Sequence, residues 1–294
     1  MEITAYAAEQ GHPPKEIKTM NKTVACSVLT LVLILFSSCS HHSGTYVLTS
    51  PAPVLDRIQS RGALIVGTAA GMPPLNMTTK DNRIIGLEVD LARALADAMG
   101  VGLTLQPIAF KDLLPALEAG KVDMVLSGMT ITAKRNTKVA FVGPYFISGK
   151  GLLTKKSTLV DIKDPAEINR SEISVTALEG STSEAFVKNV LPNATFLAAR
   201  DYNEAVNLVI GDKADVMIAD QPICVISVAR HPDEDLFALL TPFTYEPIGI
   251  ALPANDPLLI NLVHNFLNTV EDSGVLDLML ETWFQKGEWW DQVK

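Results

Sequence analysis

The amino-acid sequence predicts an α/β fold with two similar lobes. Strand-like runs alternate with helical patterns from residue 64 onward, which is typical of parallel strands joined by crossover helices. Helix-to-strand turns of similar composition then occur twice in the chain. Of the 294 residues, 48% are hydrophobic and 19% are charged, so the chain can bury a sizeable core and is not expected to be disordered.

The first set of elements lies between residues 64 and 126. Leu91, Leu95 and Met99 recur at the spacing of one helix face, and Gly100 follows as a residue type that commonly ends a helix. Apolar and β-branched runs nearby are typical of buried strands. We therefore expect strands over residues 64–67, 104–108 and 122–126, and a second helix over residues 112–119.

The second set has a related pattern. We expect strands over residues 173–176 and 216–219, and helices over residues 184–190 and 202–210. Two similar lobes explain the repeat better than one large sheet, although helix-to-strand turns are common enough to resemble each other by chance. The repeated turns are Gly120-Lys121-Val122-Asp123 and Gly211-Asp212-Lys213-Ala214-Asp215.

The amino-terminal segment has the features of a secretory signal. Met20-Asn21-Lys22-Thr23 precedes an apolar run over residues 24–36, and small residues follow. This run is shorter than the roughly 20 apolar residues that span a bilayer. We assign residues 1–38 to a signal peptide, with either Met1 or Met20 as its first residue, because the acidic residues before Met20 are unusual at a signal's start.

Phe36-Ser37-Ser38-Cys39 resembles the bacterial lipobox, with Phe36 in place of the usual leucine. The resemblance implies that Cys39 is lipidated and holds the mature protein at a membrane. An ordinary cleavage site with an incidental cysteine is the alternative. Residues 39–54 would form a lipidated tether, and His41 and His42 within it lack further ligands for a closed metal site, so we expect no metal.

Charge and cysteine content narrow the function. The formal net charge is −9, and no cluster of Lys and Arg is long enough to follow a phosphate backbone, so nucleic-acid binding is disfavoured. Cys26 falls in the predicted signal peptide and Cys39 at the predicted lipidation site. Cys224 is then the one cysteine left in the mature domain, where we expect a buried, unreactive thiol.

Several short segments carry a family resemblance through their order and spacing. They are Gly67-Thr68 with Pro73-Pro74, Gly86-Leu87-Glu88-Val89-Asp90-Leu91, Phe110 with Leu114-Pro115-Ala116-Leu117, residues 119–135 followed by Phe141-Val142-Gly143-Pro144-Tyr145, Gly180-Ser181-Thr182, and Asp220. Together they resemble the periplasmic amino-acid-binding proteins that supply polar amino acid ABC transporters. The similarity runs from about residue 55 to residue 283, nearly all of the predicted mature chain.

The resemblance implies a two-lobed periplasmic binding protein fold. Residues 55–147 plus 246–294 would form lobe one and residues 148–245 lobe two, with two crossover strands as a hinge and the ligand in the interlobe cleft. It also implies a free amino acid as ligand, an ABC transporter permease as partner and a periplasmic location. We expect a monomer without a cofactor or an enzymatic activity.

The resemblance also assigns the ligand's two charged groups. Arg135 would bind the carboxylate, opposite the Ser181-Thr182 turn at a helix start, where backbone N–H groups and the helix dipole favour anions. Asp220 would bind the ammonium. Without the resemblance, a surface role for Arg135 and helix capping by Ser181 or Asp220 are the simpler interpretations. Supporting groups come from one segment, namely Ser127, the Gly128 carbonyl and the Thr130 hydroxyl.

The side-chain pocket departs from the family pattern. Met72 stands where relatives often have an aromatic residue, Ala69 stands where some have an acid, and Phe110 leaves one aromatic face. We therefore expect a neutral polar or modestly apolar amino acid to bind better than arginine or lysine. An acidic ligand stays open, because Lys150 or Arg200 could supply a cation.

Two alternatives share the fold. Some proteins of this fold are dehydratases acting on cyclic carboxylates, and such chemistry needs a proton-transfer group in the cleft. Glu179, beside the anion-binding turn, is the one plausible general acid. The second alternative is a lipoprotein that senses a solute instead of delivering it, and the sequence does not separate sensing from transport.

Overall fold

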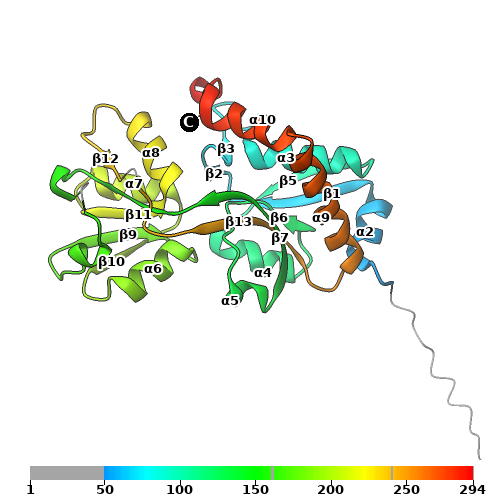
Figure 1. Cartoon of the computed structure of the whole chain (residues 1–294), viewed down its shortest axis with the longest axis horizontal. Helices are drawn as coiled ribbons and strands as arrows, with labels where there is room; N and C mark the ends of the chain where they lie inside the picture. The colour runs from blue at the N-terminus through cyan, green and yellow to red at the C-terminus, as the bar shows by residue number, and fades with distance from the viewer. Residues whose placement is uncertain (1–49, 160–161, 240, 294) are drawn as a thin grey trace, which may run out of the picture. The chain divides into compact units, whose positions relative to one another are not determined.

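The computed structural model describes residues 50–159, 162–239 and 241–293. The predicted signal peptide, Cys39 and the tether up to residue 49 lie outside the described residues. No helix within the described ranges is long and apolar enough to cross a membrane. Two five-stranded sheets, each flanked by helices, confirm the predicted α/β class and the two lobes (Figure 1).

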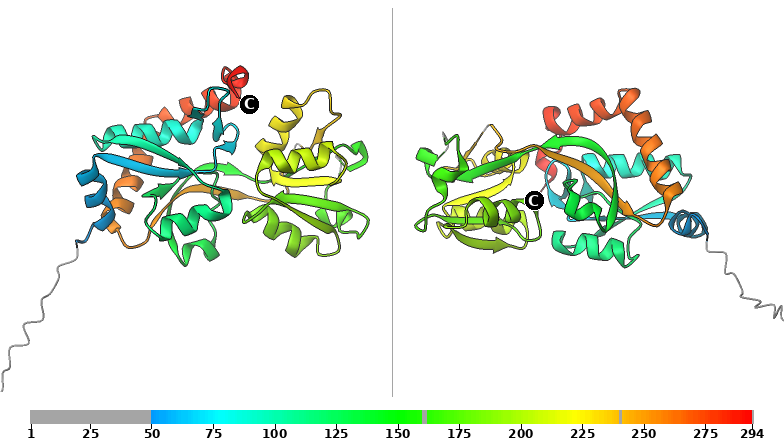
Figure 2. Two further views of the ribbon diagram at one scale, coloured as in Figure 1. Left: turned by 180° about the vertical axis from the view of Figure 1, so that it is seen from behind. Right: turned by 60° about the horizontal axis from the view of Figure 1, so that its bottom comes forward.

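The first lobe is built on one of these sheets. Its strands, in sheet order, are β5 (Gly102–Pro107), β1 (Ala63–Thr68), β6 (Met124–Val125), β13 (Glu246–Pro253) and β7 (Val139–Ser148). Its helices are α2 (Pro53–Arg61), α3 (Leu87–Ala98), α4 (Leu113–Glu118), α5 (Ala133–Asn136), α9 (Pro257–Asp272) and α10 (Val275–Glu281). β5, β1 and β6 are parallel, and β13 is antiparallel to both of its neighbours. α3 and α4 cover opposite faces of the sheet (Figures 1 and 2).

The second lobe repeats this plan. Its strands, in sheet order, are β10 (Thr195–Ala199), β9 (Ser174–Leu178), β11 (Val216–Asp220), β8 (Lys150–Thr154) and β12 (Phe237–Ala238). Its helices are α6 (Thr182–Val190), α7 (Tyr202–Ile210) and α8 (Gln221–Arg230). β10, β9 and β11 are parallel, and β8 is antiparallel to β11. The helix predicted over residues 202–210 is α7, and the strand predicted over residues 216–219 continues to Asp220 as β11.

Shorter elements complete the described chain. They are the small sheet β2 (Gly71–Met72), β3 (Asn76–Thr78) and β4 (Ile84–Ile85), and the single turns η1 (Phe110–Asp112), η2 (Ser157–Leu159), η3 (Pro165–Ile168), η4 (Thr282–Lys286) and η5 (Trp290–Gln292). β6 is shorter than the strand predicted over residues 122–126.

Two chain crossings connect the lobes, as the resemblance implied. β7 leads into β8 through Gly149, and β13 returns from the second lobe to the first sheet (Figure 1). Ser148 and Glu246 are paired in the antiparallel ladder of β7 and β13. The crossings pack so closely that a Cβ atom on Gly149 would lie 2.2 Å from the carbonyl oxygen of Thr244. The lobe boundaries at residues 55–147 plus 246–294 and 148–245 stay a prediction.

Matching aspartates explain why the two repeated turns look alike. Asp123, just before β6, accepts from the backbone amide of Ile65 at 2.9 Å and donates its own amide to the Ile65 carbonyl at 2.8 Å. Asp215, before β11, does the same with Ser174, at 2.8 Å and 2.9 Å. In each lobe this reciprocal contact fixes one central strand against its parallel neighbour.

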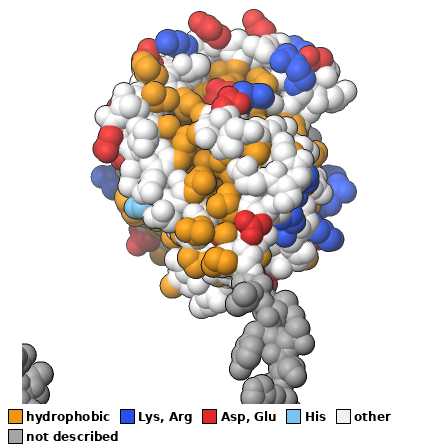
Figure 3. All heavy atoms as spheres, turned by 90° about the vertical axis from the view of Figure 1, so that its right-hand side faces the viewer, with side chains coloured by type: hydrophobic (Ala, Val, Ile, Leu, Met, Phe, Trp, Pro, Cys, Tyr) orange, Lys and Arg blue, Asp and Glu red, His pale blue; other side chains and the backbone are white. Residues whose placement is uncertain are grey.

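Part of the first lobe's surface is apolar. Figure 3 views the end of the molecule that carries α2 and α9, and hydrophobic side chains gather there in a band. Exposed hydrophobic residues of the adjoining helices include Leu258 in α9 and Leu278 in α10. Apolar atoms make up much of any folded protein's surface, so we attach no function to these residues.

Candidate functional site

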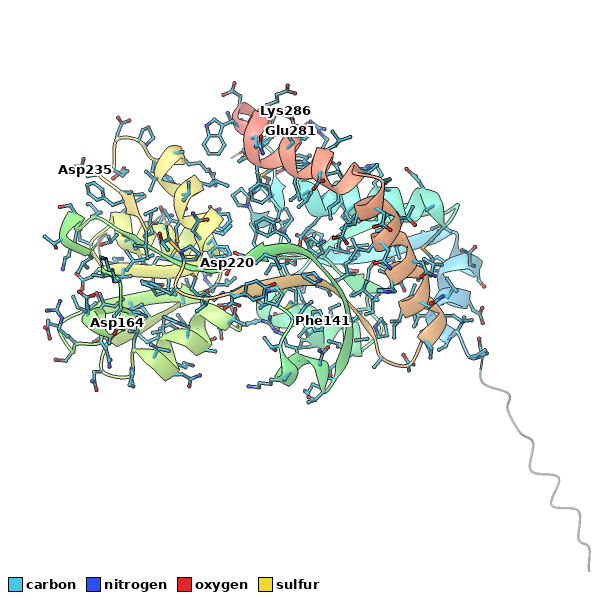
Figure 4. All side chains as sticks on the ribbon, viewed as in Figure 1. Phe141, Asp164, Asp220, Asp235, Glu281 and Lys286 are labelled. Carbon is cyan, nitrogen blue, oxygen red and sulfur yellow. The ribbon has the colours of Figure 1, made fainter. Side chains whose placement is uncertain are left out.

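The predicted site residues follow strands of both lobes, and the structure brings them together. Thr130 follows β6, Thr182 begins α6, and their hydroxyl oxygens lie 3.2 Å apart. Asp220 is the last residue of β11, and Figure 4 shows it where the second sheet meets the crossover strands. The carboxyl ends of parallel strands are where open α/β sheets place ligand-binding groups. The interlobe cleft is therefore the candidate site.

Arg135 reaches across this cleft from the first lobe. The hydroxyl of Thr132 accepts from the Arg135 amide at 3.2 Å and so begins the short helix α5. The guanidinium donates to the carbonyl of Thr130 at 2.8 Å and, across the cleft, to the carbonyl of Gly180 at 3.3 Å. Its carbon lies 5.8 Å from the ring centre of Phe110. Arg135 is thus part of the interlobe contact and not a free surface residue.

Burial of the Arg135 guanidinium changes its pKa. It lowers the pKa of Arg135, while the negative charges of Glu246 and Asp220 act in the opposite direction. An arginine side chain stays protonated under these conditions. The cleft therefore contains a fixed positive charge held near two carboxylates.

Asp220 is 6% exposed and pairs with a lysine that the sequence indicated only as a possible cation. The Nζ atom of Lys150 lies 2.6 Å from Oδ1 of Asp220 and 3.5 Å from Oε2 of Glu246. Asp220 precedes α8, yet its side chain makes no capping hydrogen bond to that helix. The helix-cap interpretation of Asp220 therefore does not describe this structure.

Glu246 is a site residue that the sequence interpretation missed. Its Oε2 atom accepts from the Thr182 hydroxyl at 3.2 Å, and its Oε1 atom accepts from the Thr244 hydroxyl at 3.0 Å. A charged residue beginning an otherwise apolar strand, Glu-Pro-Ile-Gly-Ile-Ala-Leu-Pro, is the signal that could have indicated it.

Ser181 acts as a helix cap. Its hydroxyl accepts from the amide of Glu184 at 3.1 Å and donates to the carbonyl of Leu178 at 2.6 Å. The capping interpretation is therefore correct for Ser181. Capping leaves other backbone N–H groups of the first turn of α6 available for an anion.

Hydrogen bonds to other parts of the first lobe hold the segment from Ser127 to Thr130 in place. The Ser127 hydroxyl accepts from the amide of Ala69 at 2.8 Å, and the Gly128 amide donates to Glu88 at 2.6 Å. Glu88 is fully buried, and it also accepts from the Tyr145 hydroxyl. Desolvation raises the pKa of Glu88 above its ordinary value, against the lowering effect of these hydrogen bonds.

Gly128 has a φ angle of +56°, a conformation that favours glycine. A Cβ atom there would lie 2.4 Å from the terminal methyl of Met72. The segment therefore packs directly against one wall of the side-chain pocket.

The predicted pocket residues Met72 and Phe110 are both buried and line one small cavity of about 50 Å³. The cavity lies between the lobes, and its lining residues are Ala69, Gly71, Met72, Ala109, Phe110, Leu178, Arg200, Asp201 and Tyr202. The charged members are engaged elsewhere, since Arg200 pairs with Glu204 at 2.9 Å and Asp201 caps α7. Tyr202 was not predicted; burial, aided by the charge of Asp220, raises its pKa well above the ordinary value.

Glu179, the predicted general acid of the enzymatic alternative, lies at the rim. Its Oε2 atom is 2.9 Å from the Nζ atom of Lys111, and the Glu179 side chain is 38% exposed. This pair is a further contact between the lobes. Cys224 is buried, as expected, and burial raises the pKa of its thiol. Among the described residues no group of three or more His, Cys, Asp and Glu side chains could hold a metal ion.

Comparisons with known proteins found a matching family model and several relatives. The family model of bacterial extracellular solute-binding proteins, family 3, matches residues 64–286. A cyclohexadienyl dehydratase of Pseudomonas aeruginosa is 26% identical over 272 residues, which cover 92% of this chain and 96% of that enzyme. An L-cystine-binding protein of Escherichia coli is 26% identical over 235 residues, covering 79% of this chain and 86% of that protein.

A solved structure is also similar. It is the putative binding component of an ABC transporter from Wolinella succinogenes, complexed with lysine. The two chains are 37% identical with a TM-score of 0.75, and the match covers 79% of this chain and all of the other.

Proposed function

The chain belongs to family 3 of the bacterial extracellular solute-binding proteins, and from that premise we propose that it captures a free amino acid and delivers it to an ABC importer. The observation that carries the proposal is the meeting of Arg135 with Asp220 and the two threonine hydroxyls in one cleft. A free amino acid presents a carboxylate and an ammonium, and a closed cleft must supply a partner for each. The relatives that bind L-cystine and lysine support an amino acid as ligand.

In the proposed complex, the ligand carboxylate lies between Arg135 and the first turn of α6. An arginine side chain has five N–H donors, and Arg135 uses one to bond the Thr130 carbonyl and one to bond the Gly180 carbonyl. The remaining donors can form charge-assisted bonds to a carboxylate. The backbone N–H groups after Ser181 and the hydroxyl of Thr182 would approach from the second lobe.

The ligand ammonium would bind Asp220. Lys150 contacts Oδ1 of Asp220, so Oδ2 can still accept from the ligand. The Gly128 carbonyl and the Thr130 hydroxyl would complete the set from the first lobe. The carboxylate and the ammonium each then have partners in both lobes, so that ligand binding would stabilise the closed arrangement.

The enzymatic alternative is raised by the dehydratase of Pseudomonas aeruginosa. A general acid in this cleft would have to face the ligand, whereas Glu179 is paired with Lys111 at the exposed rim. We therefore favour binding without catalysis. Incubation with a cyclohexadienyl carboxylate tests this choice, and a rise in aromatic ultraviolet absorbance above the uncatalysed rate would support the enzyme.

Localisation and anchoring belong to the proposal as well. Membership of an extracellular family fits a periplasmic protein, and lipidation of Cys39 would keep it at a membrane near the importer. Solute sensing is the alternative use of the same cleft. Growth of a strain lacking this protein, with the candidate amino acid as the limiting nutrient, separates import from sensing, since import predicts slower uptake of the labelled amino acid.

The test of the binding function is isothermal titration of the purified protein with amino acids. The proposal predicts saturable binding with one ligand per chain. Arg135→Ala should remove that binding.

A further inference from the structure

Among the described residues, Lys150 is the largest whose side chain is less than 2% exposed. Burying an ammonium is costly unless it is paired and hydrogen-bonded. Two carboxylates pair with the Lys150 ammonium: Oδ1 of Asp220 lies 2.6 Å from its Nζ atom, and Oε2 of Glu246 lies 3.5 Å from it. The first of these is also the proposed partner of the ligand ammonium.

The backbone fixes the position of Lys150. Lys150 and Asp220 are directly opposite in the antiparallel ladder of β8 and β11. The Lys150 amide donates to the hydroxyl of Thr244 at 3.0 Å, and its carbonyl accepts from the amide of Phe243 at 2.8 Å. The ammonium is therefore a fixed part of the cleft and not a mobile surface group.

Charges in and around the ligand site are balanced. Arg135 and Lys150 carry two positive charges, and Asp220 and Glu246 carry two negative charges. A zwitterion with a neutral side chain adds no net charge to this set. A ligand with a basic side chain adds one positive charge, and its ammonium already shares Asp220 with Lys150.

The side-chain cavity offers no buried carboxylate. Its walls are mostly apolar, and Asp201, its one acidic lining residue, caps α7 by accepting from the amide of Glu204 at 2.8 Å. The one acidic neighbour of a basic side chain would therefore be Asp201, which is exposed to solvent and already bonded to α7, and such an exposed ion pair contributes little.

We propose that Lys150 is a specificity-determining residue, which neutralises the excess negative charge of Asp220 and Glu246 and so restricts the cleft to amino acids with uncharged side chains. This inference rests on the proposed amino-acid-binding function. A cleft without Lys150 would hold two carboxylates against Arg135 alone. That cleft would accept the additional positive charge of arginine or lysine.

The experiment compares the affinity for arginine with the affinity for glutamine, as probes of equal backbone chemistry, by calorimetry. Lys150→Met should raise the ratio of arginine to glutamine affinity at least tenfold over that of the unmodified protein. Lys213→Met removes a positive charge from an exposed turn of the same lobe and should leave the ratio within twofold.

Two further variants complete the test: one leaves an excess positive charge in the cleft, and the other restores the balance. Glu246→Gln should raise the affinity for glutamate relative to glutamine, because it leaves one positive charge in excess. Lys150→Met combined with Glu246→Gln should return the arginine ratio to within threefold of the unmodified value. Glu246→Gln keeps the test decisive if thermal unfolding shows that Lys150→Met alone does not fold, because the double variant is expected to resemble the parent protein whether or not Lys150 sets the specificity.

The possible failures are distinguishable. If the unmodified protein binds none of the twenty amino acids, the proposed function is wrong. If it binds glutamine, and folded Lys150→Met changes the arginine ratio less than twofold, amino-acid binding stands and the role of Lys150 is overturned. If Lys150→Met does not fold, failure of Glu246→Gln to favour glutamate overturns the role instead.

Discussion

Asp215 accepts hydrogen bonds from both the backbone amide and the hydroxyl of Ser174, at 2.8 Å each. The contact joins the start of β9 to the turn before β11, and Lys156 adds an ion pair at 2.5 Å. Burial alone would raise the pKa of Asp215, but the bonds from Lys156 and Ser174 outweigh it and hold this pKa below the ordinary value. The carboxylate therefore stabilises the second lobe in its ionised form.

Asp215→Asn should lower the free energy of unfolding by about 1.5–3 kcal/mol at pH 7, the value of hydrogen bonds to a charged group. Because the folded-state pKa lies below the unfolded value, this stability is present above about pH 4 and is lost as the pH falls through the folded pKa. Urea unfolding at pH 7 and pH 3 measures the difference between variant and parent. Asp233→Asn, at an exposed loop position, is the matched control; a difference that does not shrink at pH 3 would contradict the assignment.

Gly128→Ala tests the packing of the site segment against Met72. The new Cβ atom would lie 2.4 Å from the Met72 methyl and would sit at a φ of +56°, so the variant should lose about 1–3 kcal/mol of stability. Displacement of Met72 should also weaken ligand binding. Thermal unfolding and calorimetry measure the two effects. Adding Met72→Ala removes the clash, and no recovery of stability in that double variant would show that the backbone and not the side chain is responsible.

Arg135→Ala and Asp220→Ala should both weaken ligand binding by about 2–5 kcal/mol, since each leaves one charge of the ligand unpaired in a closed cleft. Their effects on stability should differ. Asp220→Ala also removes the nearer partner of Lys150, and breaking a buried ion pair costs about 3–5 kcal/mol unless another partner remains. Glu246 remains at 3.5 Å, so we expect a loss at the lower end of that range. Binding within twofold of the parent in both variants would show that the site lies elsewhere.

Much of the fold could be predicted because its elements are marked locally. The apolar periodicity of α7 and the glycine after it predicted the observed bounds, Tyr202–Ile210. The predicted cleft residues do come together, since they follow strands whose ends meet. Lys150 and Glu246 were harder to interpret, because their pairing depends on two crossings that bring distant positions together. Periodicity reports which face of an element is buried, and it does not report which buried charges become partners.

Cys39→Ser should release the protein from the membrane fraction. Cys39 lies outside the described residues, so the prediction rests on the lipobox resemblance alone. Fractionation with palmitate labelling is the measurement, and the parent protein serves as the positive control. An unlabelled parent found in the soluble periplasmic fraction would contradict lipidation.

Calorimetric titration of the purified protein with each of the twenty amino acids tests amino-acid capture most directly. We expect saturable binding of at least one amino acid with an uncharged side chain, with one ligand per chain, tighter than that of arginine or lysine and absent from Arg135→Ala. Absence of saturable binding for all twenty would contradict the proposed function, and arginine or lysine binding more than tenfold tighter than every neutral amino acid would contradict the charge balance at Lys150.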